Sequence, residues 1–494
     1  LGSVMMIRSI DMRISDGTYR TIPVCLTQTS IYLVKIMTTP IIPFLLVLLS
    51  GTSVAFAAAP VHEFTLANGL KVLVREDHRA PVVVSQIWYK VGSSYEPSGL
   101  TGISHLLEHM MFKGTPNVPG GEFSRLVAAN GGDENAFTSY DYTAYFQTLE
   151  KERLELSFRL EADRMRHLLL KPEDIAKEAQ VVAEERRLRT DDQPEALTQE
   201  QFQAAAYVTN PYRHPIIGWM QDIQSITPDD LKNWYQRWYA PNNATLVVVG
   251  DVDPAKVREL AEKHFGPLPP STLAPPKPVT EIPQRGERRI VIKTPAEVPY
   301  VTLGYKTPTL KTATEDWEPY ALAVLEGILD GGTSARLDKD LIRGSQVAAA
   351  AGASYSPISR LDDLFVLAGN PAPDHTSAEL EKALRTEVAR LREELVGADE
   401  LARVVAQVAA ADVYQQDSMF YQGMRLGTLE TVGLGWSRLD DYVQRVQAVT
   451  PEQIRAVARK YLIDDHLTVA TLEPLPLDGR RPSAPGPATD HAIR

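Results

Sequence analysis

Two histidines and a glutamate lie close together in the segment TGISHLLEHMMFKGT, which begins at Thr101. On a helix, His105 and His109 occupy positions i and i+4, so both imidazoles project from one face. Two neutral imidazoles at that spacing can hold one Zn²⁺ ion. Glu108 lies on the same side and can accept a proton from water instead of binding the metal. The pattern favours hydrolytic zinc chemistry; the alternative is a buried helix whose histidines only satisfy hydrogen bonds in the core.

A hydrolytic zinc site needs a third protein ligand besides the two imidazoles. The stretch KPEDIAKEAQVVAEERRLRTDDQP predicts a second helix, on which Glu178 and Glu185 are seven residues apart and share one face. Glu184 points about 100° away from that face. A solvated charged face is the alternative for such a helix. Val181 and Val182 lie between the two carboxylates, however, so the stripe borders an apolar surface that favours a buried role.

The segments that must position these helices show strand patterns followed by helix patterns. FTLANGLKVLVRED alternates apolar and polar residues about Asn68-Gly69, a pair typical of hairpin turns, and VVVSQIWYKVGSS follows as a second strand. In the second half RRIVIKTP and YVTLGYKTP take that part, and a long helical stretch runs from Ser377 to Tyr414. Strands, then amphipathic helices, then a closing strand predict an α+β fold: an antiparallel sheet with helices packed on one face.

The chain also contains an internal repeat. TPDDLKNWYQRWYAPNNATLVVVG, from Thr227, aligns without a gap with TPEQIRAVARKYLIDDHLTVATLE, from Thr450. Each segment begins a helix at Thr-Pro and ends in a short strand rich in β-branched residues. The equal length and the equal position within each half favour duplication over two unrelated helix–strand units. Two homologous domains are therefore expected.

A proline-rich stretch, GPLPPSTLAPPKPVTEIP, separates the two halves and is typical of a semi-rigid linker. The polar, proline-rich end of the chain is predicted to be disordered. The expected organisation is a leader with a signal peptide over 1–57, an N-terminal zinc-binding catalytic domain over 58–268, the linker over 269–283, a homologous domain without metal over 284–477 and a disordered tail over 478–494.

The leader is predicted from an apolar run, IIPFLLVLLSGTSVAF, that ends in an A-x-A cleavage pattern at residues 55–57. A membrane anchor is the alternative, but residues 50–53 dilute the run, and a spanning helix needs about 20 mostly apolar residues. Val34, taken as an initiator, would place the start of translation directly before Lys35. We therefore expect an exported, periplasmic protein without a stable membrane anchor.

Composition excludes several classes of protein. The chain has 494 residues, of which 44% are hydrophobic and 23% charged, an ordinary globular composition. Its formal net charge is −12, whereas nucleic-acid-binding proteins usually carry a basic surplus. Cys25 is the single cysteine and lies in the predicted leader. A disulfide scaffold and a cysteine-based zinc site are therefore excluded.

Taken together, these motifs resemble the inverted-motif zinc peptidases of the pitrilysin and insulinase family. The resemblance is carried by HLLEH, by the E-x6-E pair that ends 76 residues after the last histidine, by NAFTSYDYTAYF and by the segment from His214 to Pro254. It covers the chain from about His62 to Pro474, and the length of the halves is similar to the short bacterial, processing-peptidase-like members. The resemblance implies two homologous α+β domains that close like a clamshell around peptide.

The resemblance also assigns roles to individual residues. His105 and His109 match the imidazole ligands of one Zn²⁺ ion per chain, and Glu185 matches the third ligand. Glu108 matches the general base that activates water for attack on the peptide carbonyl. Glu178 matches a further acidic residue of the catalytic machinery, which orients a ligand.

The resemblance extends to substrate binding, with one departure. Asn135 and Ala136 match edge-strand positions that take the substrate as an added strand, and NAFTSYDYTAYF is itself a β-type run. Family members that act alone carry, in the second half, an Arg followed seven residues later by a Tyr, which hold the substrate carbonyl. Here the matching positions are Ile342 and Ala349, and no Arg of the second half has a Tyr seven residues on. The chain thus resembles the zinc-bearing member of a heterodimer whose homologous partner, without zinc, supplies that pair.

The expected function is that of a zinc metalloendopeptidase, a hydrolase that cleaves peptides or unfolded segments by zinc-activated water with Glu108 as general base. A non-catalytic, peptide-binding or structural subunit of a two-chain assembly is the alternative. The intact set of His105, Glu108, His109 and Glu185 favours the enzyme.

Overall fold

The computed structural model describes residues 12–13, 19–20, 59–274 and 277–477. The chain falls into two units, Leu1–Ala57 and Ala58–Arg494. In the first unit, β1 (Met12–Arg13) and β2 (Tyr19–Arg20) form an antiparallel pair. The predicted signal sequence, its cleavage pattern, Cys25, the start at Val34 and the predicted disordered tail lie outside the described residues. Within the described residues, no helix combines the length and the apolar character needed to cross a membrane.

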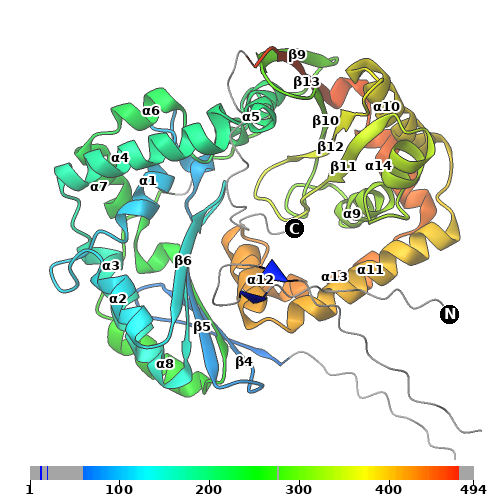
Figure 1. Ribbon diagram of the computed structural model, residues 1–494. Helices are drawn as coiled ribbons and strands as arrows, with labels where there is room; N and C mark the ends of the chain where they lie inside the picture. Colours follow the sequence, from blue (N-terminus) through cyan, green and yellow to red (C-terminus); the bar gives the residue numbers. More distant parts are fainter. Residues whose placement is uncertain (1–11, 14–18, 21–58, 275–276, 478–494) are drawn as a thin grey trace, which may run out of the picture. The chain divides into compact units, whose positions relative to one another are not determined.

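The first half of the second unit is built on a mostly antiparallel sheet (Figure 1). Its strands, in spatial order, are β3 (Val61–Thr65), β4 (Lys71–Glu76), β8 (Ala244–Gly250), β5 (Val82–Tyr89), β7 (Thr143–Glu150) and β6 (Asp133–Thr138). The predicted hairpin about Asn68-Gly69 joins β3 to β4 and is confirmed. The β-type run from Asn135 is a hairpin rather than one strand, because the chain turns at residues 139–142, where Ser139 N–H donates to Tyr142 O.

Helices cover one face of this sheet. They are α1 (Ile103–Met110), α2 (Glu122–Ala129), α3 (Leu154–His167), α4 (Pro172–Arg186), α6 (Met220–Ser225), α7 (Pro228–Trp238) and α8 (Pro254–His264). Their apolar sides form one core with the strands, in which Leu106 of α1, Val182 of α4 and Leu231 of α7 are fully buried. The two helices that carry the predicted site residues are therefore anchored in the same core.

The second half repeats this design. Its strands, in spatial order, are β11 (Ala348–Ser354), β12 (Asp363–Pro371), β10 (Tyr300–Thr307), β13 (Leu467–Leu475) and β9 (Arg288–Pro295). Its helices are α9 (Glu318–Leu329), α10 (Ser377–Glu393), α11 (Ala398–Gln416), α12 (Met419–Thr431), α13 (Tyr442–Gln447) and α14 (Pro451–Tyr461). The long helical stretch predicted from Ser377 is two helices. The backbone becomes extended at Glu394, and Val396 is buried in the second core before α11 begins.

The predicted repeat is confirmed. α7 and α14 both begin with a capping box, in which Thr227 or Thr450 and the residue three positions on bond to each other's backbone N–H. The strand that follows each helix, β8 or β13, lies between one parallel and one antiparallel neighbour. The order β4-β8-β5-β7-β6 thus matches β9-β13-β10-β12-β11. The expected α+β class with two homologous halves is confirmed, while the domain boundaries stay predictions.

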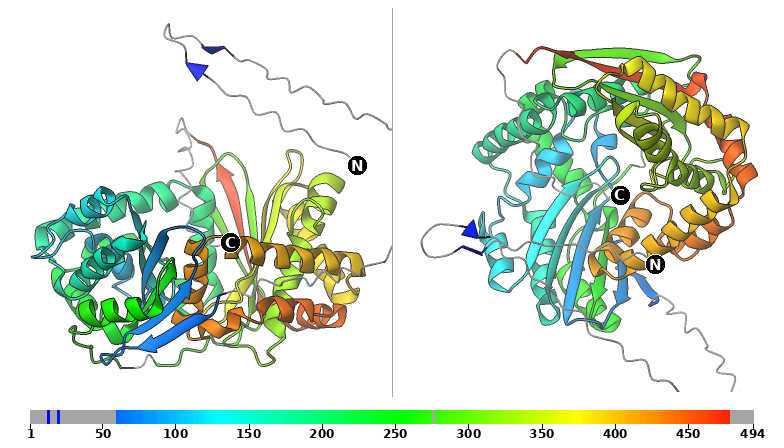
Figure 2. Two further views of the ribbon diagram at one scale, coloured as in Figure 1. Left: turned by 90° about the horizontal axis from the view of Figure 1, so that it is seen from below. Right: turned by 45° about the vertical axis from the view of Figure 1, so that its right-hand side comes forward.

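The halves exchange one helix each across the faces that their own helices leave open. α12 of the second half packs on β5 and β8, where Met424 and Leu426 meet Trp88. α5 (Pro194–Ala206) of the first half packs on β9, β10 and β13, where Phe202 meets Ala470. The two further views in Figure 2 show the strands of the halves as separate sheets with helices around them. Each half thus supplies a helix that covers central strands of the other half's sheet.

A side chain at Gly427 of α12 should weaken this exchange. A Cβ at this position would lie 2.1 Å from Cε2 of Trp88, whose ring is fully buried. We expect Gly427→Ala to lower the free energy of unfolding by about 3 kcal/mol, the upper end of the usual cost of overpacking. Urea unfolding measures the change. Gly397→Ala, where a Cβ meets only Glu400 Oε2 at 3.8 Å, is the control and should cost at most about 1 kcal/mol. Unchanged stability of Gly427→Ala would contradict this packing.

Candidate metal centre

The helix that carries both histidines, α1, starts from a firmly held N-terminus. Gly102 precedes the helix with φ 88°, a left-handed conformation that glycine adopts without strain. The N–H groups of Gly102 and Ser104 donate to the two carboxylate oxygens of Glu96 at 2.7 and 2.8 Å. A carboxylate at this place satisfies free N–H groups of the first turn and interacts favourably with the helix dipole. Leu106 and Leu107 are fully buried, so they fix the rotation of the helix about its axis.

α4 packs against α1 and brings a carboxylate to the imidazoles. His109 Nε2 lies 3.4 Å from Glu185 Oε2, and His105 Nε2 lies 3.8 Å from Glu185 Oε1. The potential ligand atoms of the three residues all lie within 4.8 Å of one another. Their side chains are mostly buried, with 12% to 22% of the surface exposed. The structure thus brings together the three residues that the family resemblance implies as ligands.

This arrangement fits a zinc ion. In a tetrahedral site with bonds of about 2.0–2.2 Å, neighbouring ligand atoms are about 3.3–3.6 Å apart. The two distances from Glu185 to the imidazoles are close to that spacing. Two imidazole nitrogens and a carboxylate oxygen are ligands that zinc prefers, and three protein ligands leave a position open for water or substrate. Among the described residues, no other group of His, Cys, Asp and Glu side chains has this geometry.

Glu178 lies on the far side of His109. Its Oε2 is 3.3 Å from His109 Nδ1, and its Oε1 is 2.5 Å from Lys113 Nζ. A carboxylate in this place accepts a hydrogen bond from Nδ1, fixes the tautomer of the ring and raises the basicity of Nε2. Glu178 and Glu185 both face α1, as their spacing predicts. Glu184 points to solvent, with 65% of its side chain exposed.

Glu108 lies on α1 between the two histidines and contacts the end of β6. Thr138 Oγ1 donates a hydrogen bond to Glu108 Oε2 at 2.5 Å. Burial raises the pKa of Glu108 to about 7, although the hydrogen bond from Thr138 opposes the shift. A cation at the neighbouring imidazoles would lower this pKa again. A carboxylate beside a candidate metal site can accept a proton from water, which is the property of a general base.

A cavity of about 910 Å³ opens beside these side chains. β6 forms one wall, and among the described residues it is the last strand of its sheet on this side. Asn135 and Ala136 lie on β6 and line the cavity. The N–H of Ala136 donates to Asn135 Oδ1 at 2.9 Å, so a side chain engages the main-chain donor there. The two residues predicted to bind substrate therefore lie at an open sheet edge next to the potential ligands.

Four residues of the site are not found by sequence reasoning: Glu96, Lys113, Thr138 and Arg189. Arg189 Nη1 lies 2.5 Å from Glu185 Oε1, and half of its side chain is exposed. Arg189 and Lys113 each follow a site residue by four positions, a spacing that marks neighbours on a helix and could have found them. Glu96 and Thr138 come from other segments, so no local spacing points to them.

The second half offers no polar side chain at the positions matched to the Arg and Tyr. Ile342 lies in η6 (Leu337–Gly344) and packs, partly buried, against the second core. Ala349 lies on β11 and is exposed. Neither side chain can donate a hydrogen bond to a substrate carbonyl.

Comparison with known proteins extends the observations on the site. Residues 71–219 match the family described as Insulinase (Peptidase family M16), and residues 225–408 match the domain described as Peptidase M16 inactive domain. The chain is 39% identical to zinc protease PqqE of Helicobacter pylori over 360 residues, which cover 71% of this chain and 78% of PqqE. It is 30% identical to an uncharacterized zinc protease of Mycobacterium leprae over 419 residues, which cover 83% of this chain and 91% of that relative.

Solved structures share the fold. The crystal structure of a protease from Helicobacter pylori has a TM-score of 0.81 and 32% sequence identity, and the match covers 85% of this chain and 100% of that chain. The periplasmic protease PqqL from Escherichia coli has a TM-score of 0.70 at 22% identity, and the match covers 84% of this chain and 48% of PqqL. The likeness to PqqL concerns the fold alone.

Zinc affinity should fall as the pH falls. Burial opposes a positive charge on His109, but the carboxylates of Glu185 and Glu108 raise its pKa above the usual value. A proton therefore competes with zinc for this imidazole in the metal-free protein. One displaced proton weakens binding about tenfold per pH unit below that pKa. Competition with a chelating dye between about pH 8 and pH 6, where histidine titrates, measures the slope.

Two variants control this measurement. His264→Ala removes a histidine that pairs with Glu155 and does not line the cavity, so the slope should not change. Glu185→Gln removes a candidate ligand, so zinc should bind more weakly at every pH. A zinc affinity that stays constant across the pH range in the parent chain would contradict the assignment of His109 as a ligand.

Proposed function

Because the chain belongs to the insulinase (M16) family of peptidases, we propose that it is a zinc-dependent endopeptidase that hydrolyses peptides or unfolded segments. Its relatives in Helicobacter pylori and Mycobacterium leprae are named zinc proteases. The observation that carries the proposal is the cluster of His105, His109 and Glu185, with ligand atoms within 4.8 Å of one another and the carboxyl group of Glu108 beside it.

Zinc held by these three residues would lower the pKa of a water molecule and polarise a peptide carbonyl. The other steps belong to side chains of the chain itself. Glu108 takes the proton from the attacking water and delivers it to the leaving nitrogen. Thr138 holds Glu108 in place through its hydrogen bond. Glu178 keeps His109 in one tautomer through Nδ1, so Nε2 stays available as a ligand.

The open edge of β6 supports an extended substrate. A peptide that adds to this edge as a strand gains main-chain hydrogen bonds and needs no particular side-chain sequence. We assign substrate binding to Asn135 and Ala136, where a substrate carbonyl would replace Asn135 Oδ1 as the acceptor for Ala136 N–H. Unfolded segments meet this need, since folded proteins keep most of their main-chain groups paired.

The proposal includes the compartment and a partner. The A-x-A pattern at residues 55–57 supports cleavage of a leader and export to the periplasm. Ile342 and Ala349 stand where an Arg and a Tyr would hold the substrate carbonyl. We therefore propose that a homologous subunit without zinc supplies these two donors.

A non-catalytic, peptide-binding role is the second candidate. The same two positions favour it, since the side chains of Ile342 and Ala349 cannot donate a hydrogen bond to the substrate. The match of residues 225–408 to the Peptidase M16 inactive domain also agrees with a second half that performs no chemistry. A chain of this kind would bind extended peptides at β6 and release them uncut.

The general base gives the direct test. We expect Glu108→Gln to keep its zinc, because no ligand is changed, and to lose hydrolysis by about 10²-fold or more, because the proton acceptor is lost. Zinc content by metal analysis and cleavage of a fluorogenic peptide, with and without chelator, measure both. Glu184→Gln makes the same change at an exposed position of α4 and should retain activity. Near-normal turnover by Glu108→Gln would remove Glu108 from this role, and a parent chain that binds zinc but never cleaves, even with its partner, would favour the second candidate.

The missing donors predict dependence on a partner. The purified chain should bind zinc yet cleave peptides poorly, because two groups that hold the carbonyl and stabilise developing charge are absent. Addition of the partner should raise kcat/KM by about 10²-fold or more. Titration of the chain with the protein that co-purifies with it measures this gain. Full activity of the chain alone, unchanged by any partner, would contradict supply of the donors in trans.

A further inference from the structure

The cavity at the metal centre has a cationic side chain in its wall that the proposed chemistry does not use. Arg213 belongs to η4 (Pro211–Arg213), lines the cavity and is half-buried. Its Nη1 donates a hydrogen bond to the main-chain oxygen of Val208 at 2.8 Å. Among the described residues, Arg213 forms no ion pair with a carboxylate. Its charge therefore stays available to a molecule in the cavity.

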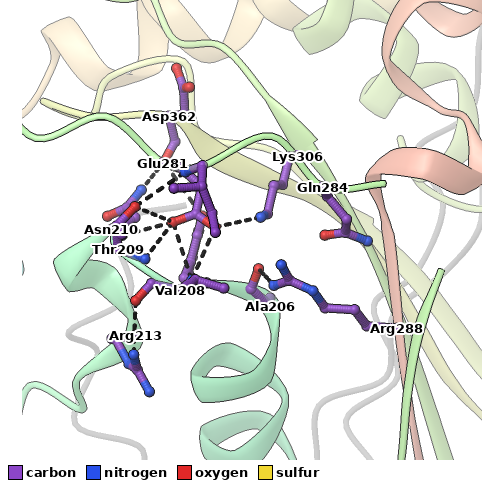
Figure 3. A network of polar contacts seen from close by, with 12 residues as sticks. Ala206, Val208, Thr209, Asn210, Arg213, Glu281, Gln284, Arg288, Lys306 and Asp362 are labelled. Carbon is purple, nitrogen blue, oxygen red and sulfur yellow. Dashed lines mark hydrogen bonds and ion pairs between the residues drawn. The ribbon is translucent and has the colours of Figure 1, made fainter. Parts of the chain in front are cut away.

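The loop that carries Arg213 is held by a buried carboxylate from the linker (Figure 3). Glu281 accepts hydrogen bonds from the N–H groups of Val208, Thr209 and Asn210 at 3.0, 2.8 and 2.8 Å. Lys306 Nζ lies 2.6 Å from Glu281 Oε1. Burial alone would raise the pKa of Glu281, but these donors lower it to about 2, so the carboxylate stays ionised. The main chain that leads to Arg213 is fixed at three successive residues.

The turn itself is also fixed on its other side. Asn210 Oδ1 accepts a hydrogen bond from the N–H of Tyr212 at 3.0 Å, and the Tyr212 ring is buried. Tyr212 also accepts hydrogen bonds from the main-chain N–H groups of Arg360 and Leu361 in the second half. In Figure 3 the guanidinium of Arg213 points away from Glu281. A cation on a rigid turn binds a partner with little loss of conformational entropy.

The carboxylates around the cavity are already engaged. Glu200 forms a two-pronged, buried ion pair with Arg186, with distances of 2.6 and 2.7 Å. Glu185 contacts Arg189 and the two imidazoles. Glu108 accepts a hydrogen bond from Thr138. A divalent cation at the candidate ligands would add positive charge to the cavity, although the whole chain carries a formal charge of −12.

We propose that Arg213 is a specificity-determining residue that selects peptides with an acidic side chain close to the scissile bond. The inference rests on the proposed function, since it assumes that an extended peptide enters this cavity. A guanidinium presents a planar fork that matches the two oxygens of a carboxylate, so Asp and Glu side chains are the groups it recognises best. A basic side chain at the same place meets the charges of Arg213 and the metal and is disfavoured.

Binding to an inactive chain tests the inference apart from catalysis. Labelled peptides of one sequence carry Glu, Gln or Lys at each position in turn, and fluorescence anisotropy with zinc-loaded Glu108→Gln measures their Kd. At one of these positions the Glu peptide should bind about tenfold or more tightly than the Lys peptide, the effect of one charge-assisted hydrogen bond. The difference should shrink as salt is added, because salt screens charges at half-exposed positions.

Variants of Arg213 in the same background assign the preference. Arg213→Lys keeps the charge and should keep the order of the peptides, Arg213→Gln should reduce the ratio about tenfold, and Arg213→Glu should reverse it in favour of Lys. A merely structural role would not reverse the order. Arg258→Gln is the control, because it removes one positive charge from α8, whose Arg258 does not line the cavity. It should leave the ratio unchanged.

The outcomes separate this inference from the proposed function. A Glu preference that depends on the charge at position 213 supports the inference even if the parent chain never cleaves a peptide, which would count against the peptidase alone. The inference would be overturned if the Glu and Lys peptides bind equally or if neither binds. It would also be overturned if Arg213→Glu leaves the preference unchanged. Cleavage by the parent chain in those cases would leave the peptidase standing.

Discussion

The packing of α1 against α4 is the contact on which the candidate site depends. The two imidazoles lie on α1 and Glu185 lies on α4, so neither helix alone holds all three candidate ligands. Leu106 of α1 and Val182 of α4 are fully buried in the same core. Burial of these apolar sides fixes the rotation of both helices and leaves their polar sides facing each other. Hydrophobic packing therefore places the imidazoles of one helix beside the carboxylates of the other.

The exchange of helices explains why the two halves act as one molecule. α12 covers the first sheet and α5 covers the second, so each half buries an apolar face that it could not cover alone. Glu281 adds a polar joint, since its carboxylate ties the linker to the loop at Val208 and to Lys306 of the second sheet. The exchanged helices lie on the faces of the sheets and not on the edge at β6. Among the described residues that edge stays unpaired, next to the candidate metal ligands.

The two halves share a strand topology but differ in the chemical groups that they carry, as expected for a duplication followed by divergence. The strand orders correspond, so β11 of the second half is the counterpart of β6. The first half combines this edge with the candidate metal ligands and with Glu108. In the second half, as far as it is described, the same topology carries no metal-binding group, and Ile342 and Ala349 stand near the counterpart strand. The second half contacts the first half through α12 and through the hydrogen bond from the main-chain N–H of Arg360 to Tyr212.

Local patterns in the sequence predict most of the helices and strands and the types of the chemical groups. The spacing of His105 and His109 needs only a helix, and the repeat of Thr227 and Thr450 needs only a capped helix start, so both could be read without a structure. Other contacts depend on the packed fold: the hydrogen bond from Thr138 to Glu108 and the ion pair between Lys113 and Glu178. The turn within the β-type run from Asn135 is also visible only in the structure. The tertiary structure also decided the exchange of α5 and α12 and the place of Arg213 in the cavity wall. The physical reason is range: periodic patterns report neighbours within a helical turn or along a strand, whereas these contacts join distant segments and form only when the common cores pack.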